Sequence, residues 1–187
     1  MISDVNAIES TQVADNIAVD SLRSKSAEDF ARVKGHVKVV KTHLDGTEEL
    51  VCEGDNVITI NGIDWLIAQA YTNSTSGTRG ANFLALSNNQ TDTTASDTTF
   101  PGEITGQGLA RVDLVAASTG SVTHTDNTNT VVLTNVFTAT GTVSNIHKAA
   151  LFYGASETQP IHNFTFASDT SLASGERVTV TWTVTLA

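Results

Sequence analysis

Side chains suited to catalysis or metal binding are few and widely spaced along the chain. There is one cysteine, Cys52, and there are five histidines: His36, His43, His124, His147 and His162. A zinc site needs several His or Cys ligands held together. His36 and His43 lie an odd number of residues apart on one expected strand, so they point to opposite faces. The sequence therefore predicts no metal site, and the histidines are expected at the surface or at contacts.

Cys52 and His43 face each other across an expected hairpin and superficially suggest a nucleophile with its base. No residue is placed to orient that histidine, and no feature for stabilising an oxyanion is evident. We therefore interpret Cys52 as a buried structural cysteine. The chain also lacks the G-x-S-x-G, GxGxxG and P-loop patterns. No catalytic or cofactor-binding residue is predicted, and we expect the protein not to be an enzyme and to use no cofactor.

Carboxylate side chains suggest two further features, a calcium site and an ion pair. Asp92 and Asp97 lie with Asn88 and Asn89 in a polar loop over residues 88–103, where their oxygens could bind calcium. The EF-hand pattern is absent, and the alternative is that these side chains cap turns. Glu103 and Arg111 flank a bend and are candidates for an ion pair. If the pair is exposed, it is worth only ~0–1 kcal/mol.

The charge of the chain limits its partners. The 187 residues carry a net charge of -10 and contain only 10 Lys and Arg residues. Phosphate groups are bound by clustered Lys and Arg, so nucleic acid and anionic membranes are not expected as partners. Charged residues make up 16% of the chain, against about 25% in soluble proteins generally. Neutral hydroxyls and amides must cover much of the surface, which favours contacts with other subunits.

Most of the chain has the pattern of short strands. Two runs, 36–44 and 47–54, are joined by Asp45-Gly46, which is a strong hairpin signal. Ile60, Ile63 and Ile67 have helical spacing and predict one amphipathic helix within 55–71. Further strands are expected at 82–87, 108–117, 130–140, 144–154, 161–168 and 176–186. This order predicts a mainly β domain over 35–187, an antiparallel β-sandwich or barrel.

Residues 1–34 differ from that domain. They are polar and show no alternation, and they have neither the hydrophobic core of a signal peptide nor an apolar run of the ~20 residues that span a membrane. Within them, 26–33 has a weak helical pattern with Ser26 as a cap. Two interpretations stay open for this extended or partly helical N-terminal arm: a disordered tail, or a segment that orders on a neighbouring subunit. In the second, Phe30 and Arg32 are candidate subunit contacts.

The last strand alternates strictly. Val178, Val180, Trp182, Val184 and Leu186 form one face, which belongs in a core. The opposite face consists of Thr179, Thr181, Thr183 and Thr185. Threonine suits an outer strand face exposed to water. Alternatively, the four hydroxyls form an uncharged contact surface for another subunit, where no charge has to be dehydrated. These four threonines are the remaining candidate subunit contacts.

Several segments occur in a recognisable order. They are HVKVVKTHLDGTEELVCEGDNVITINGIDWL, ANFLALSNN, ASDTTFPGEI, GLAR, FTATGT, HKAALF and SGERVTVTWTVTL. This order resembles a loose family of virion structural proteins from tailed bacteriophages and related archaeal viruses, and the resemblance covers residues 35–187. The matching positions are Asn56, Asp97 to Phe100, Glu103, Gly108, Arg111, Phe137 to Thr140 and Ala150 to Phe152.

The resemblance implies a jelly-roll-like β-sandwich that works in an oligomer on the virus particle. The family includes capsid decoration, or cement, proteins, and the acidic, threonine-rich chain with its polar arm favours this role. Such a protein binds the major capsid protein and stabilises the assembled shell. A homotrimer is then expected, because the symmetry of an oligomer tends to match its site. Such a protein is made in the host cytoplasm and resides in the virion. The alternative is a component of the tail, a tail fibre or an adaptor, with binding to a host receptor.

Overall fold

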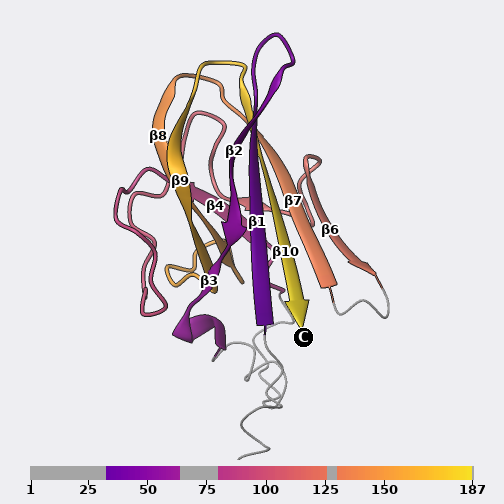
Figure 1. The fold of residues 1–187 in the computed structure, drawn as a ribbon, viewed down its shortest axis with the longest axis vertical. Helices are drawn as coiled ribbons and strands as arrows, with labels where there is room; N and C mark the ends of the chain where they lie inside the picture. Colours follow the sequence, from indigo (N-terminus) through magenta and orange to yellow (C-terminus); the bar gives the residue numbers. More distant parts are fainter. Residues whose placement is uncertain (1–32, 64–79, 126–129, 187) are drawn as a thin grey trace, which may run out of the picture. The chain divides into compact units, whose positions relative to one another are not determined.

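The computed structural model describes residues 33–63, 80–125 and 130–186. Within these ranges the chain is mainly β, with almost no helix (Figure 1). The strands are β1 (Val33–Thr42), β2 (Glu48–Asp55), β3 (Val57–Ile58), β4 (Phe83–Ser87), β5 (Val112–Asp113), β6 (Gly120–Thr125), β7 (Thr130–Thr138), β8 (Val143–Phe152), β9 (His162–Leu172) and β10 (Arg177–Leu186).

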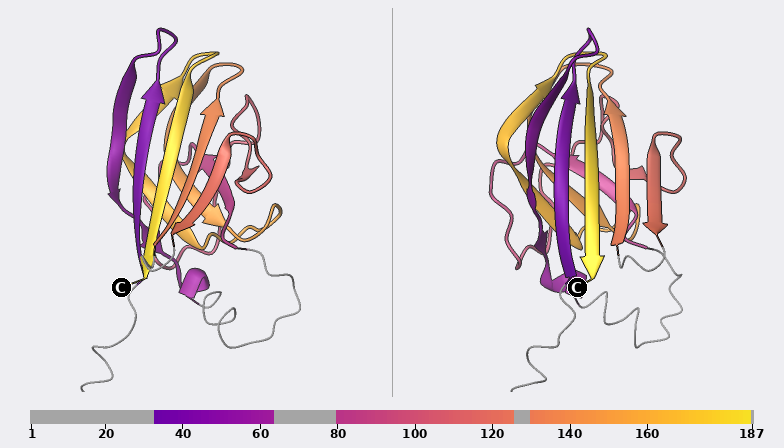
Figure 2. Two further views of the ribbon diagram at one scale, coloured as in Figure 1. Left: turned by 90° about the vertical axis from the view of Figure 1, so that its right-hand side faces the viewer. Right: turned by 45° about the vertical axis from the view of Figure 1, so that its right-hand side comes forward.

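The strands form two antiparallel sheets of five strands each. The first has the order β2-β1-β10-β7-β6, and the second has the order β3-β9-β8-β4-β5. Figure 2 shows them as two layers, with β1 and β10 side by side in one and β8 and β9 in the other. The predicted mainly β, antiparallel fold is confirmed, and the layers are compatible with a β-sandwich. This strand order does not establish a jelly-roll topology.

The main hydrophobic core is built by side chains from both sheets. Val37 and Val180 of the first sheet and Leu84 and Leu151 of the second are fully buried in it. Trp182 is also fully buried, so the expected role of the apolar face of the last strand is confirmed. Burying one aromatic side chain of this size removes ~150–250 Å² from water. The core therefore fixes which face of β10 points outward.

A second, smaller apolar cluster lies on the other side of the second sheet. Neighbouring residues of a strand point to opposite faces. Leu84 and Leu86 belong to the main core, whereas Phe83 and Ala85 belong to the second cluster. The other members of that cluster are Phe100, Ala150 and Phe152. Phe100 comes from the loop over 88–103, so this loop covers β4 and β8 from outside.

The predicted hairpin is confirmed. β1 pairs with β2 through Asp45-Gly46, where Gly46 has a φ of 84° and Asp45 Oδ1 accepts a hydrogen bond from the backbone N–H of Thr47 at 2.9 Å. β1 begins at Val33, two residues before the Gly35 at which we expected the domain to start. Residues 1–32, with Phe30 and Arg32, lie outside the described residues.

The expected amphipathic helix is not confirmed. Val57 and Ile58 pair with Asn163 and His162 of β9, and helical residues occur only at 60–63 within the described chain. Thr59 Oγ1 accepts from the N–H of Gly62 at 3.0 Å, so Thr59 caps this turn. Ile67 and Trp65 lie outside the described residues. No helix in the described ranges is long and apolar enough to cross a membrane.

The expected apolar face of this helix is not confirmed in its described part either. Ile60 and Ile63 are 57% and 49% exposed. Gly62 permits a close contact with the chain before β9. A Cβ atom there would lie 2.3 Å from the carbonyl oxygen of Ile161.

Two strand boundaries in the second half of the domain differ from expectation. The strand expected over 108–117 is reduced to Val112–Asp113, because Asp113 turns the chain: its Oδ1 accepts from Val115 N–H and its carbonyl from Ala117 N–H. A strand, β6, occupies 120–125, between the segments 108–117 and 130–140 for which we expected strands. It pairs with β7 as the edge strand of the first sheet.

Candidate functional site

The four threonines of β10 lie on the outer face of the first sheet. β10 is the central strand of that sheet, between β1 and β7. Val178, Val180 and Trp182 point into the core, so Thr179, Thr181, Thr183 and Thr185 point away from it. All four are half-buried by their neighbours within this one chain. The structure therefore brings these four predicted contact residues into one row.

The neutral character of this row extends across two further strands. Val132, Thr134 and Val136 of β7 lie beside it, and Ser121 and Thr123 of β6 lie beyond them. Thr134 Oγ1 donates to Thr181 Oγ1 at 3.4 Å, and the hydroxyls of Thr130 and Thr185 lie 3.3 Å apart. We call this surface the threonine face: Ser121, Thr123, Thr130, Val132, Thr134, Val136, Thr179, Thr181, Thr183 and Thr185.

Charged side chains begin on the other side of β10. Lys34, His36 and Lys38 of β1 lie beside Thr185, Thr183 and Thr181. The imidazole of His36 is 2.9 Å from Glu53 and 3.2 Å from Asp55 on β2. Hydrogen bonds to Glu53 and then Asp55 raise the pKa of His36.

The outer face of the first sheet thus changes from neutral on β10, β7 and β6 to basic on β1 and acidic on β2. Dehydrating hydroxyls that can pair again costs much less than dehydrating charges. Another protein could therefore cover the outer face of β10, β7 and β6 at a lower dehydration free energy than that of β1 and β2.

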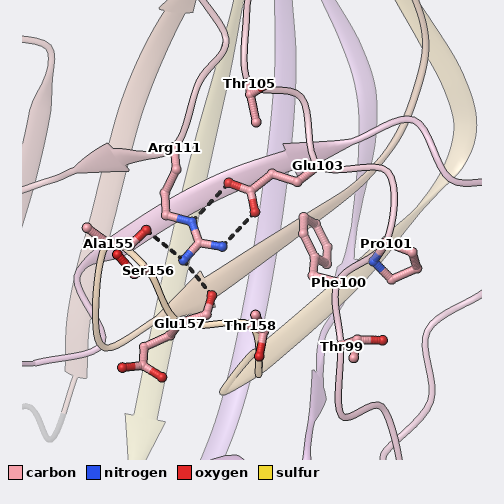
Figure 3. A pocket seen from close by; sticks show the side chains of 10 residues that line it. All are labelled: Thr99, Phe100, Pro101, Glu103, Thr105, Arg111, Ala155, Ser156, Glu157 and Thr158. Carbon is pink, nitrogen blue, oxygen red and sulfur yellow. Dashed lines mark hydrogen bonds and ion pairs between the residues drawn. The ribbon is translucent and has the colours of Figure 1, made fainter.

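Arg111 forms the centre of a clamp on the second sheet (Figure 3). Its Nε and Nη2 donate to the two carboxylate oxygens of Glu103, at 3.0 and 2.6 Å. Its side chain is 10% exposed and that of Glu103 is 21% exposed. The predicted pairing of these two residues is confirmed. The alternative of an exposed pair is wrong, because loops enclose both side chains.

The same guanidinium holds a third segment of the chain. Nη1 donates to the carbonyl oxygens of Gly154, Ala155 and Glu157, at 3.0, 3.3 and 2.7 Å. The guanidinium carbon lies 3.7 Å from the centre of the Phe152 ring, which is a cation–π contact. Most of its N–H groups are engaged, so Arg111 acts as a structural clamp rather than as a site for an anionic ligand.

A shallow hollow opens beside the clamp. Its rim carries hydroxyl groups, and its lining includes Thr99, Pro101, Thr105, Ser156 and Thr158 (Figure 3). Nearby, Tyr153 donates to Glu157 at 2.8 Å, and this bond raises the pKa of the tyrosine. The hydroxyls of the hollow can form hydrogen bonds, and none is paired with a base in the described structure.

The structure does not bring Cys52 and His43 together. Cys52 lies in the main core, and burial raises the pKa of its thiol to about 11. A thiol with this pKa is almost entirely protonated near neutral pH and is a poor nucleophile. His43 instead contacts Glu176 at 3.0 Å and Glu49 at 3.1 Å.

The remaining histidines with described side chains are also separate from one another. His147 lies 2.5 Å from Asp169, and His162 is buried against Trp182. Among the described residues, no group of three or more His, Cys, Asp or Glu side chains could hold a metal ion.

Glu176 is a buried carboxylate that forms ion pairs, and the sequence did not point to it. It follows Gly175 before β10, accepts a hydrogen bond from Ala173 N–H at 2.7 Å and pairs with Lys41 at 3.0 Å. These bonds, with that to His43, lower the pKa of Glu176 to about 2. A Glu after a Gly-containing turn gives too weak a signal to predict this arrangement.

Of the two carboxylates considered as calcium ligands, Asp97 is engaged in hydrogen bonds that hold its own turn. Asp97 accepts hydrogen bonds from Thr94 N–H at 3.1 Å, from the Thr94 hydroxyl at 2.7 Å and from Asn163 Nδ2 at 3.1 Å. Asp97 therefore caps its own turn and ties the loop to β9. The side chain of Asp92 is 87% exposed.

Comparison of the chain with models of protein families, with curated proteins and with solved structures gives no match. The chain's own features that bear on its function are the neutral threonine face on one sheet and the clamped loop on the other.

Proposed function

We propose that the protein is a virion structural protein of a tailed bacteriophage or related virus, and that it acts as a capsid decoration protein. In this proposal a jelly-roll-like β-sandwich self-associates, as a homotrimer, and binds the major capsid protein on the outside of the shell. The observation that carries the proposal is the threonine face. It is a neutral surface on three strands, half-buried on β10 and β7 and exposed on β6.

The chemistry of this face suits a permanent contact. Valine side chains on it gain from burial, and hydroxyls can exchange bonds with water for bonds with another subunit. The bordering Lys34 and Lys38 on β1 and Glu53 and Asp55 on β2 provide opposite charges at one side of the sheet. In a ring of identical subunits such charges set the register of the contact more than its strength.

The positions that carry the family resemblance also support a structural role. Glu103, Arg111 and Phe152 meet in the clamp. Phe100 lies edge-on to Phe152 at 5.6 Å between ring centres. The shared motif thus consists of residues that hold loops on a sheet, as expected of a module whose work is to remain folded on a particle.

The proposal is tested by binding to empty capsids of the virus that encodes the chain. The variant Thr179→Glu places a charge on the threonine face between Val40 and Val136. The control Thr98→Glu places the same charge at an exposed threonine in the loop over 88–103. Far-ultraviolet circular dichroism and thermal melting would establish that each variant is folded before binding is measured.

We expect the unaltered chain and Thr98→Glu to sediment with capsids, and Thr179→Glu to bind at least about tenfold more weakly. Equal binding of the two variants would show that the threonine face is not a contact. If the unaltered chain failed to bind capsids but was found on purified tails, the decoration role would be wrong.

A further inference from the structure

A buried lysine lies beneath the loop that covers the second sheet. Lys148 is on β8, between Ser87 of β4 and Thr165 of β9, and is 3% exposed. Its Nζ donates a hydrogen bond at 2.9 Å to Oδ1 of Asn89, which belongs to the loop over 88–103. The two residues are 59 positions apart in the chain. Their side chains meet because the loop folds back over the sheet.

The partner of this amine is neutral. None of the ion pairs among the described residues involves Lys148, whereas buried lysines are rarely found without an ionic partner. Burial lowers the pKa of Lys148, and the charges of Asp97 and then Asp92 partly oppose this effect. Lowering the pKa increases the fraction of neutral amine, which is the nucleophilic form.

The Asn89 amide is held in a way that favours attack on its carbon. Oδ1 accepts the hydrogen bond from Lys148 and a second one, at 3.1 Å, from the backbone N–H of Thr91. A fixed N–H group aimed at a carbonyl oxygen stabilises the negative charge that forms there when a nucleophile adds. Nucleophile, electrophilic amide and oxyanion donor are thus in contact within one folded chain, which replaces an encounter in solution by fixed proximity.

We propose that Lys148 and Asn89 join in an intramolecular isopeptide bond. The neutral Nζ adds to Cγ of Asn89 and forms a C–N bond, with the negative charge on Oδ1 held by Thr91 N–H. One proton passes from Nζ to Nδ2, the Cγ–Nδ2 bond breaks, and the carbonyl re-forms. The products are a secondary amide between the two side chains and one molecule of ammonia. No oxidant, cofactor or other reactant is consumed.

This bond would fix the covering loop to β8 covalently. A cross-link between residues far apart in sequence restricts the unfolded chain and so raises the stability of the folded one. Its stabilising effect would add to those of Phe100 and the Arg111 clamp, which hold the same loop further along. The bond would form whether or not the protein binds a virus particle.

The test is the intact mass of the full chain, purified and denatured. The expected mass is below the sequence mass by one ammonia molecule. Lys148→Arg and Asn89→Ala should each restore their own sequence mass, whereas Lys38→Arg, which alters an exposed lysine, should keep the loss. Proteolytic fragments should include one branched peptide that contains Lys148 and Asn89. The cross-linked chain should also melt at a higher temperature than either uncross-linked variant.

A chain at its full sequence mass would overturn the proposal, and this result does not depend on whether any variant folds. Asparagine can also lose ammonia by cyclising onto its own backbone. Persistence of the loss in Lys148→Arg, or its assignment to another residue by fragmentation, would therefore equally overturn it. In either case the Lys148–Asn89 contact would be a hydrogen bond only.

Discussion

At Arg111 one side chain connects three segments that are far apart in sequence. Replacing Arg111 with Ala leaves the largely enclosed Glu103 carboxylate without its ionic partner and removes the contact with Phe152. Breaking an enclosed pair from one side generally costs about 3–5 kcal/mol. We expect the free energy of unfolding, measured by urea denaturation, to fall by about 3 kcal/mol.

The matched control is Arg177→Ala. Arg177 is an exposed arginine on β10, and its loss should change the unfolding free energy by less than about 0.5 kcal/mol. Similar small losses for the two variants would contradict the role given to the clamp.

His162 gives the domain a predicted sensitivity to acid. It is 3% exposed, lies 2.7 Å from Asn56 and packs edge-on against Trp182. Burial lowers its pKa from the ordinary value of 6.5 to about 4. Between these values the unfolded chain binds a proton that the folded chain does not, so stability falls as the pH decreases through this window. The expected loss from this group is about 3 kcal/mol.

Urea unfolding of the unaltered chain and of His162→Gln at pH 7 and pH 4 would measure this contribution. The stability advantage of the unaltered chain over the variant should shrink by about 3 kcal/mol at the lower pH. The other ionisable groups are present in both chains and cancel in the comparison. An advantage that is the same at both pH values would exclude His162 as the cause.

Among the elements, the turn before β5 depends on Gly108. Its φ is 78°, and a Cβ atom there would lie 2.1 Å from the carbonyl oxygen of Thr138. Gly108→Ala should therefore lower the unfolding free energy by at least about 2 kcal/mol. Gly106, two residues earlier, has nothing within 4 Å of such a Cβ. Gly106→Ala should change stability by less than about 0.5 kcal/mol, and thermal melting of the two variants would show the difference.

The alternation of apolar and polar residues predicted most of the strands, because one face of each strand packs in a core. The hairpin at Asp45-Gly46 and the buried face of β10 were predictable for this reason. The positions of Glu103 and Arg111 on either side of a bend also suggested that they pair. The burial of this ion pair was not predictable, because it comes from Phe152 and the loop after it.

The elements and contacts that the sequence did not predict depend on pairing between segments far apart in the chain. The helical spacing of Ile60 and Ile63 did not reveal that Val57 and Ile58 pair with β9. β6 was missed because SVTHT lacks large apolar residues and is held mainly by its pairing with β7. The contact between Lys148 and Asn89 depends on how the loop folds over the sheet, which neither residue signals locally.

In the described molecule, the two sheets have different outer faces. That of the second sheet is covered by the chain's own loop, which is held by Phe100, by Arg111 and by Lys148. That of the first sheet carries the threonine face, which is half-buried on β10 and β7 and exposed on β6. A protein that stays clamped on one side and presents a neutral surface on the other fits assembly into a larger particle.

The most direct test of this account is the number of copies of the protein in purified virions, measured by quantitative mass spectrometry against the major capsid protein. A decoration protein that follows the symmetry of the shell should be present at about one copy for each copy of the major capsid protein. A handful of copies per particle, or none, would contradict the central claim.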